Sequence, residues 1–214
     1  MKYRRFFALI IAAALVISLA SCSRAPKEEP QNLEAASSED ALQEDAEEPE
    51  EAEPRDGKDT LVVYFSATGT TKGVAEKIAD ITDADIYEIT AAQEYTAEDL
   101  NWNDSNSRTT LEQNDSSVRP EIGSEPISLE GYSVIFIGYP IWWGEEPRIM
   151  DTFAESYNFD GITMIPFCTS TSSGIGRSGK NLAENAGSGN WLEGKRFGSG
   201  ASESELEEWI NALQ

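Results

Sequence analysis

Four hydroxyl side chains and a glycine gather in the short stretch Ser66-Ala67-Thr68-Gly69-Thr70-Thr71. The apolar run Leu61–Phe65 precedes it, and apolar residues at helical spacing follow from Val74 to Ala79. A loop between a strand and a helix N-terminus aims its backbone N–H groups at one spot, where the helix dipole favours an anion. The stretch therefore predicts an anion site for a phosphate, built from uncharged donors. The alternative is a Ser/Thr-rich turn that only caps a helix.

Two further segments carry residue types that suit a flat polar ligand. Adjacent indoles stand in Pro140–Pro147, and Thr169–Gly176 consists of Thr, Ser and Gly apart from one Ile. We interpret the first segment as an aromatic border and the second as backbone that can approach a planar ring closely. Trp142 and Trp143 could instead be core residues or a protein-contact patch, and the Thr169–Gly176 segment could be a flexible turn.

Each of these three segments follows a run that is typical of a buried strand. The strongly apolar runs are Leu61–Phe65, Tyr132–Tyr139 and Ile162–Cys168, and weaker strands are predicted at Asp85–Thr90 and Trp191–Phe197. Helices are predicted from about Thr71 to Ala79, Pro147 to Tyr157 and Ser178 to Ala186, and after the capping box Ser202-Glu203-Ser204-Glu205.

Strands that alternate with helices indicate an α/β fold, a five-stranded parallel sheet covered by helices on both faces. A strand order of 2-1-3-4-5 places the strands that end at Phe65, Tyr139 and Cys168 side by side. In such sheets ligands bind outside the carboxyl ends of the strands. We therefore expect the three polar segments to form one site.

A long polar connection, Tyr95–Ile122, separates the second and third predicted strands. It is rich in Asn, Asp, Ser and Glu. Short helical pieces are predicted within it at Ala97–Trp102 and Arg108–Asn114, and the proline at position 120 ends any helix.

The N-terminal residues predict export rather than fold. Met1–Cys22 has a basic start and an apolar core from Phe6 to Ala20, shorter than the roughly 20 residues that a spanning helix needs. Its end, Leu19-Ala20-Ser21-Cys22, resembles the lipobox of bacterial lipoproteins, which implies acylation at Cys22. The alternative is an uncleaved or conventionally cleaved signal. The predicted organisation is a signal peptide at 1–22, a tether at 23–58 and one domain at 59–214.

Acidic residues dominate the tether and also the domain. Glu28–Glu53 holds twelve acidic residues and no basic one, a composition that predicts a disordered, extended spacer, with an interaction tail as the alternative. Residues 55–214 hold 27 acidic and 11 basic residues. A domain this acidic disfavours nucleic acid and suits a basic protein partner.

Cysteine and histidine usage excludes several kinds of chemistry. The chain has two cysteines, and with Cys22 acylated no intramolecular disulfide is available to Cys168, which we expect to be a buried small apolar residue. There is no histidine, which excludes a histidine-based catalytic triad or metal site. We predict no metal ligands and no catalytic side chain.

From about Asp59 to its C-terminus the chain resembles the flavodoxin family. Ser66-x-Thr68-Gly69-x-Thr71 matches the phosphate-loop pattern T/S-x-T-G-x-T, and Tyr139-Pro140-Ile141-Trp142-Trp143-Gly144 is similar to the flavin-facing loop of one branch. The resemblance implies a flavodoxin-like three-layer fold, FMN as cofactor and electron transfer.

The same resemblance assigns cofactor-binding roles by position. It implies that the phosphate lies against Ser66, Thr68, Gly69, Thr70 and Thr71, that the isoalloxazine is bordered by Pro140, Ile141, Trp142, Trp143 and Gly144, and that Thr169, Ser170, Thr171 and Gly174 close its other side. The third loop lacks the aromatic residue that many flavodoxins have there, and Tyr95–Ile122 matches no counterpart. We expect Glu145 and Glu146 to form a solvated rim, and Lys72 to be the only basic residue near the phosphate loop.

Three functions fit these features. The first is a membrane-anchored FMN protein that carries electrons on the outer face of a bacterial cytoplasmic membrane, or on the outer membrane if the cell has one. The second is an FMN-dependent enzyme that reduces a quinone or another small acceptor with NAD(P)H. The third is a non-redox module that binds another phosphorylated ligand. The expected partner is a redox protein or a small-molecule acceptor.

Overall fold

The structure of the protein is a computed structural model that describes residues 58–213. The predicted signal peptide with Cys22 and nearly all of the predicted acidic tether lie outside the described residues. None of the helices within the described range is long and apolar enough to cross a membrane.

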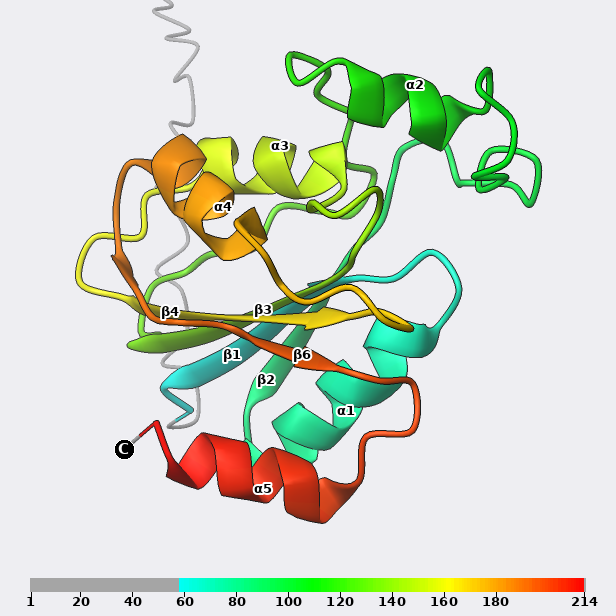
Figure 1. Cartoon of the computed structure of the whole chain (residues 1–214). Coiled ribbons are helices and arrows are strands. Elements are labelled where there is room, and N and C mark those ends of the chain that lie inside the picture. The colour runs from blue at the N-terminus through cyan, green and yellow to red at the C-terminus, as the bar shows by residue number, and fades with distance from the viewer. Residues whose placement is uncertain (1–57, 214) are drawn as a thin grey trace, which may run out of the picture. The chain divides into compact units, whose positions relative to one another are not determined.

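A twisted parallel sheet forms the centre of the domain (Figure 1). Its strand order is β2-β1-β3-β4-β5, and β6 also pairs with β4. All strand pairs are parallel, so the predicted fold class and strand order are confirmed. The strands are β1 (Thr60–Phe65), β2 (Asp85–Ile89), β3 (Val134–Pro140), β4 (Thr163–Thr169), β5 (Asn190–Trp191) and β6 (Lys195–Phe197).

The predicted last strand, Trp191–Phe197, is wrong as one continuous strand. It consists of β5 and β6, which pair with different parts of β4 and are separated by residues 192–194. Pro166 of β4 lies beside this break and has no N–H to donate to the ladder. Gly194 packs so closely against it that an added Cβ would lie 2.6 Å from the Pro166 carbonyl oxygen.

Helices cover both faces of the sheet, as Figure 1 shows. α1 (Thr70–Thr82) and α5 (Glu203–Asn211) lie on one face, and α3 (Arg148–Ser156) and α4 (Ser178–Ala186) lie on the other. Side chains of a strand point alternately to the two faces, so Val62 and Val63 of β1 belong to different core clusters. This two-sided burial explains why the strands read as continuous apolar runs.

The connection between β2 and β3 contains one helix rather than the two predicted. α2 (Arg108–Asn114) is confirmed, and it lies beyond α3 in Figure 1. The predicted helix at Ala97–Trp102 is wrong, because the segment forms only turns. Thr96 and Asp99 exchange side-chain-to-backbone hydrogen bonds as at a helix start, but the turn that follows is not continued. Asn101 instead accepts a hydrogen bond from the N–H of Asn103, which favours a turn there.

The N-termini of α1 and α5 are built differently, and the difference matters for the site. Ser202 of the predicted capping box caps α5, where it accepts a hydrogen bond from the N–H of Glu205 at 3.2 Å. α1 instead begins after Gly69, whose φ of 82° lies in the left-handed region that favours glycine. No side chain caps that helix start. The first-turn N–H groups of α1 therefore have no intrahelical acceptor and remain available to a ligand.

Candidate functional site

A cavity of about 380 Å³ lies at the carboxyl ends of the three central strands. Residues from all three predicted loops line it, together with one residue from the loop after β6. The lining residues are Thr68, Thr70, Pro140, Ile141, Trp142, Thr169, Ser170, Thr171, Ser172, Ser173 and Ser199. Of these eleven, eight carry hydroxyls and none is ionisable at neutral pH, so the cavity offers donors without charge.

The loop after β1 contributes Thr68 and Thr70 to the cavity wall. Gly69 lies between them and turns the chain into α1. An anion at this point would meet two hydroxyls and the free N–H groups of the first helical turn. Both the N–H groups and the helix dipole favour negative charge there.

Ser66, the first residue of this loop, has a buried hydroxyl oxygen without a hydrogen-bond partner among the described residues. A buried polar group that stays unpaired costs free energy. Ser66 does not line the 380 Å³ cavity but borders a neighbouring one of about 230 Å³, which also includes Glu88 and Tyr95. The unpaired hydroxyl suits a bound polar ligand better than an empty site.

Thr71 has a different place from the one that the motif suggests. Its side chain is buried, and its hydroxyl lies 2.8 Å from the hydroxyl of Thr169. It therefore joins the first loop to the third rather than lining the cavity. Lys72, which follows it, forms an ion pair with Glu88 at 3.6 Å, so this lysine is partly neutralised.

The second loop is a tight turn that separates the two indoles. Backbone bonds join Trp142 and Glu145 in both directions, at 2.9 and 3.0 Å. Trp143 and Gly144 between them both have positive φ, 51° and 89°, as a two-residue hairpin turn of the type I′ kind requires. Trp142 consequently lines the cavity. Trp143 is 46% exposed and lies outside the cavity.

Trp142 is held edge-on by two other aromatic rings. Its ring centroid lies 5.7 Å from that of Phe65 and 5.3 Å from that of Tyr95. Tyr95 belongs to the long connection, and sequence reasoning did not place it at the site. Its hydroxyl donates to Glu112 at 2.8 Å, and the Arg108 guanidinium lies 3.9 Å from its ring centre. Burial, then the bond to Glu112, raises the pKa of Tyr95, so it stays a neutral donor.

Glu146 is not part of a solvated rim, and that prediction is wrong. It is 1% exposed, and Asn181 of α4 donates to both carboxylate oxygens at 3.2 Å. Burial, followed by the charge of Asp151, raises the pKa of Glu146 to about 7. The turn at Trp142–Glu145 directs this carboxylate inward, between α3 and α4, which no local pattern in the sequence reveals.

Arg148 links the second loop to its surroundings. Its guanidinium donates to Glu145 at 2.9 Å, to Asp151 at 3.4 Å and to the carbonyl of Gln113 at 3.1 Å. Burial also raises the pKa of Asp151. A single buried cation thus faces three carboxylates, counting Glu146 at 3.9 Å. The second loop is anchored by this network as well as by Trp142.

The third loop brings Thr169, Ser170 and Thr171 to the cavity, whereas Gly174 does not line it. Ser170 donates to the carbonyl of Ser173, which folds the loop onto itself. Arg196 of β6 donates to the loop from beneath. Arg196 and Ser199 are site residues that the sequence analysis missed, because they lie on or after an edge strand whose pairing only the fold establishes.

Cys168 lies just below the third loop in β4 and is fully buried, as predicted. Burial raises the pKa of its thiol to about 12. Since only the thiolate is a strong nucleophile, this residue is chemically inert at neutral pH.

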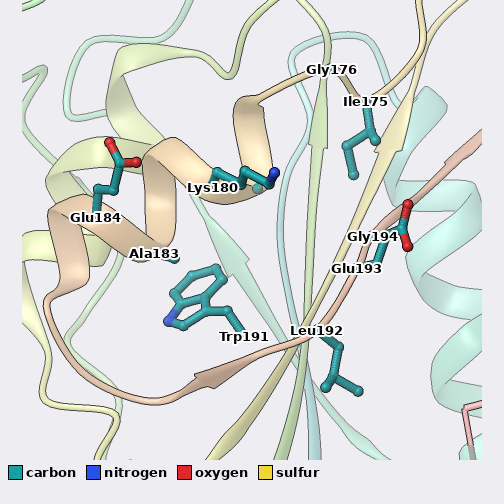
Figure 2. Close-up of a pocket in the computed structure, with 10 residues that line it drawn as sticks. Ile175, Gly176, Lys180, Ala183, Glu184, Trp191, Leu192, Glu193 and Gly194 are labelled. Carbon is teal, nitrogen blue, oxygen red and sulfur yellow. The ribbon is translucent and has the colours of Figure 1, made fainter.

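A second cavity, of about 560 Å³, lies between α4 and the break in the edge strand (Figure 2). Trp191 faces α4 there, and Lys180 and Glu184 extend from the helix at its rim. Ile175 and Gly176 of the third loop also line it. An added Cβ on Gly176 would lie 3.5 Å from the carbonyl of Gly144. The second cavity therefore begins where the second and third loops meet.

Comparison with known proteins adds a family and several structural relatives. A family model described as flavodoxin matches residues 59–213. The structure of a flavoprotein from Bacteroides uniformis is similar, with 47% sequence identity and a TM-score of 0.69. The alignment covers 72% of this chain and 99% of the other. A flavoprotein from Bacteroides eggerthii has 42% sequence identity and a TM-score of 0.68, and the alignment covers 73% of this chain and 98% of the other.

A more distant structure is that of a flavoprotein from Lactobacillus acidophilus in complex with FMN. It has 26% identity and a TM-score of 0.54, and the alignment covers 72% of this chain and 99% of the other. No curated protein sequence matches the chain.

Proposed function

The chain belongs to the flavodoxin family, and we propose that its domain binds FMN and transfers electrons outside the cytoplasmic membrane. The observation that carries the proposal is the uncharged cavity at which three strand-end loops meet. The similar Lactobacillus acidophilus flavoprotein, whose structure contains FMN, supports the choice of cofactor. FMN supplies the redox chemistry when bound, since it accepts and releases electrons reversibly.

The residues of the first loop fit a phosphate. Thr68 and Thr70 would donate their hydroxyls, and the free first-turn N–H groups of α1 would add charge stabilisation. The unpaired hydroxyl of Ser66 would gain a partner. Thr71 would act indirectly, by holding Thr169 of the third loop in place.

The second and third loops would hold the ring system. Trp142 presents an aromatic side chain to the cavity, and Ser170–Ser173 also line it. Because the lining residues of the third loop include no aromatic side chain, one side of the ring would stay open to a reactant. The chain's part is to bind, to orient and to exclude water from one face, so no catalytic acid or base is required.

The test is the visible spectrum of the purified domain, residues 55–214. We expect a yellow protein, or a colourless one that becomes yellow and quenches flavin fluorescence when FMN is added. A colourless protein that cannot be reconstituted with FMN would contradict the redox proposal and favour a module for another phosphorylated ligand.

A second candidate function is reduction of a small acceptor such as a quinone by NAD(P)H. The 560 Å³ cavity favours it, because its volume suits a small molecule and its walls include Trp191 and Ile175. The two functions differ in anaerobic mixing with NADPH. Direct bleaching of the flavin indicates the reductase, whereas reduction only through a protein partner indicates the carrier.

We also propose that the domain is attached to the membrane through a lipid on Cys22, with the acidic segment as spacer. Replacement of Cys22 by Ala should move the protein from the membrane fraction to the soluble fraction. Continued membrane retention of the variant would indicate an uncleaved signal instead. In both cases the spectrum of the domain is expected to stay the same.

A further inference from the structure

We propose that Arg196 is a positioning residue of the cofactor site, which shapes the third loop and supplies a positive charge directly behind the cavity wall. The inference rests on the proposed function, since it concerns the wall that would face the flavin ring. Arg196 belongs to β6 and does not itself line the cavity.

The guanidinium of Arg196 makes three hydrogen bonds to the third loop. It donates to the carbonyl oxygens of Ser170 at 2.8 Å and Thr171 at 2.6 Å, and to the hydroxyl of Ser170 at 3.3 Å. Bonds from a charged donor are stronger than neutral ones, and the planar fork of arginine can serve several acceptors at once. Lysine cannot reproduce this geometry.

Little else in the described part of the chain holds these residues. Residues 171–174 are exposed, and the loop between Thr169 and Ile175 contains no apolar side chain that could anchor it in the core. The backbone bond from the Ser170 N–H to the Phe197 carbonyl, at 3.2 Å, ties only its first residue to β6. The conformation of the cavity wall therefore depends on the arginine.

The charge of Arg196 also matters for the site. No carboxylate among residues 58–213 forms an ion pair with it. Its field reaches β4, where it opposes the burial effect on the thiol pKa of Cys168. In a domain with a large acidic excess, an uncompensated cation under the cavity favours the reduced and more negative state of a bound flavin.

The test measures two properties of each variant: the affinity of the flavin-free domain for FMN and for riboflavin, which lacks the phosphate, and the potential of the flavin-loaded domain. Arg196→Gln should weaken both ligands by the same factor, about tenfold, because the third loop faces the ring and not the phosphate. It should also shift the flavin potential to more negative values. Arg196→Lys should weaken both ligands but keep the potential, since it retains the charge and loses the fork.

Arg177→Gln is the matched control, because the Arg177 side chain is exposed and pairs only with Glu184 across the described residues. It should leave affinity and potential unchanged. Equal affinities of wild type and Arg196→Gln for both ligands, or a loss confined to FMN, would overturn the inference. A wild-type domain that binds no FMN would instead overturn the proposed function, so the two failures are distinguishable.

Discussion

Hydroxyl groups rather than charges define the proposed phosphate subsite. Thr68, Thr70 and Ser199 line the cavity, and the nearby Lys72 is engaged by Glu88. Neutral donors bind an anion with less electrostatic gain than lysine or arginine, so the N-terminus of α1 must supply part of the stabilisation. The residue types therefore suit a ligand that also gains affinity elsewhere, from its ring.

The two adjacent indoles should differ sharply in their effect on the cofactor. Trp142→Leu is expected to weaken FMN binding by about tenfold, because it removes the aromatic surface that lines the cavity. Trp143→Leu should change the dissociation constant less than about threefold, since this side chain is 46% exposed and outside the cavity. Flavin fluorescence titration measures both constants, and a larger effect at Trp143 would contradict this assignment.

Glu146 makes the stability of the domain depend on pH. Its pKa of about 7 in the folded state lies above the value of 4.5 that an exposed glutamate has. The folded state therefore holds a proton that the unfolded chain has released, and stability falls as pH rises from about 4.5 to about 7. The charged groups that face Glu146 are Arg148 and Asp151. Its polar neighbours are Asn181 and the side-chain amide of Gln113, which donates to the Glu146 carbonyl.

Glu146→Gln should remove this pH-dependent loss. Relative to wild type, the variant should gain roughly 3 kcal/mol in unfolding free energy between pH 5 and pH 8, because the amide never has to ionise. Urea unfolding at the two pH values measures it. Glu145→Gln, whose carboxylate is 48% exposed, is the control and should show no such gain. A constant difference at both pH values would show that Glu146 does not titrate in this range.

At the scale of elements, the loop after β1 divides its hydroxyls between two tasks. Thr70 starts α1 and lines the cavity, whereas Thr71 is buried and bonded to Thr169 at 2.8 Å. Successive residues at a helix start point in different directions, so one faces the ligand and the next faces the neighbouring strand.

Substitutions of these two threonines should separate binding from stability. Thr70→Ala is expected to weaken FMN about fivefold to tenfold and leave riboflavin unchanged, because it removes a phosphate donor. Thr71→Val should instead lower the unfolding free energy by about 1–3 kcal/mol, since the buried Thr169 hydroxyl loses its partner. Titration with both flavins and urea unfolding of the apo domain measure the two effects. If only Thr71→Val lost the preference for FMN over riboflavin, Thr71 and not Thr70 would be the phosphate donor.

The long connection between β2 and β3 packs against the second loop and supports it. Tyr95 packs against Trp142, and the side-chain amide of Gln113 in α2 donates to the carbonyl of Glu146 at 3.0 Å. Arg148 closes the contact by donating to the carbonyl of Gln113. The long polar connection thus holds the indole of Trp142, which lines the cavity, in place.

The whole molecule carries a strong negative charge, with 27 acidic and 11 basic residues from position 55 onward. Such a field attracts cations and repels anions over distances set by the Debye length. The electrostatic environment of the site is therefore that of the entire domain, even though its lining is neutral.

Salt should consequently affect oppositely charged small electron acceptors in opposite directions. Oxidation of the reduced domain by a cationic acceptor should slow severalfold between about 0.01 M and about 1 M salt, over which the Debye length falls from about 30 Å to about 3 Å. Oxidation by an anionic acceptor should accelerate over the same range. Stopped-flow absorbance measures both rates, and a like response of the two acceptors would rule out control by the net charge.

The sequence was a good guide wherever periodicity alone decides the structure. The apolar runs located β1, β3 and β4, and the capping box at Ser202 located the start of α5. The single predicted strand at Trp191–Phe197 was wrong, because Pro166 on a neighbouring strand interrupts the edge. The predicted helix at Ala97–Trp102 was wrong because its capped first turn is not continued, and Asn101 binds the N–H of Asn103 in a local turn.

The amino-acid sequence alone predicts the parallel sheet and the polar loops at its edge, because these depend on hydrophobic period and on the shared direction of the strands. The strand order, now observed, was expected from the resemblance to the flavodoxin family. Tertiary contacts were needed to assign Trp142 inward and Trp143 outward, to bury Glu146, and to bring Arg196 under the third loop. Side-chain direction in a turn and pairing across an edge depend on residues distant in the chain. Local spacing carries no information about them.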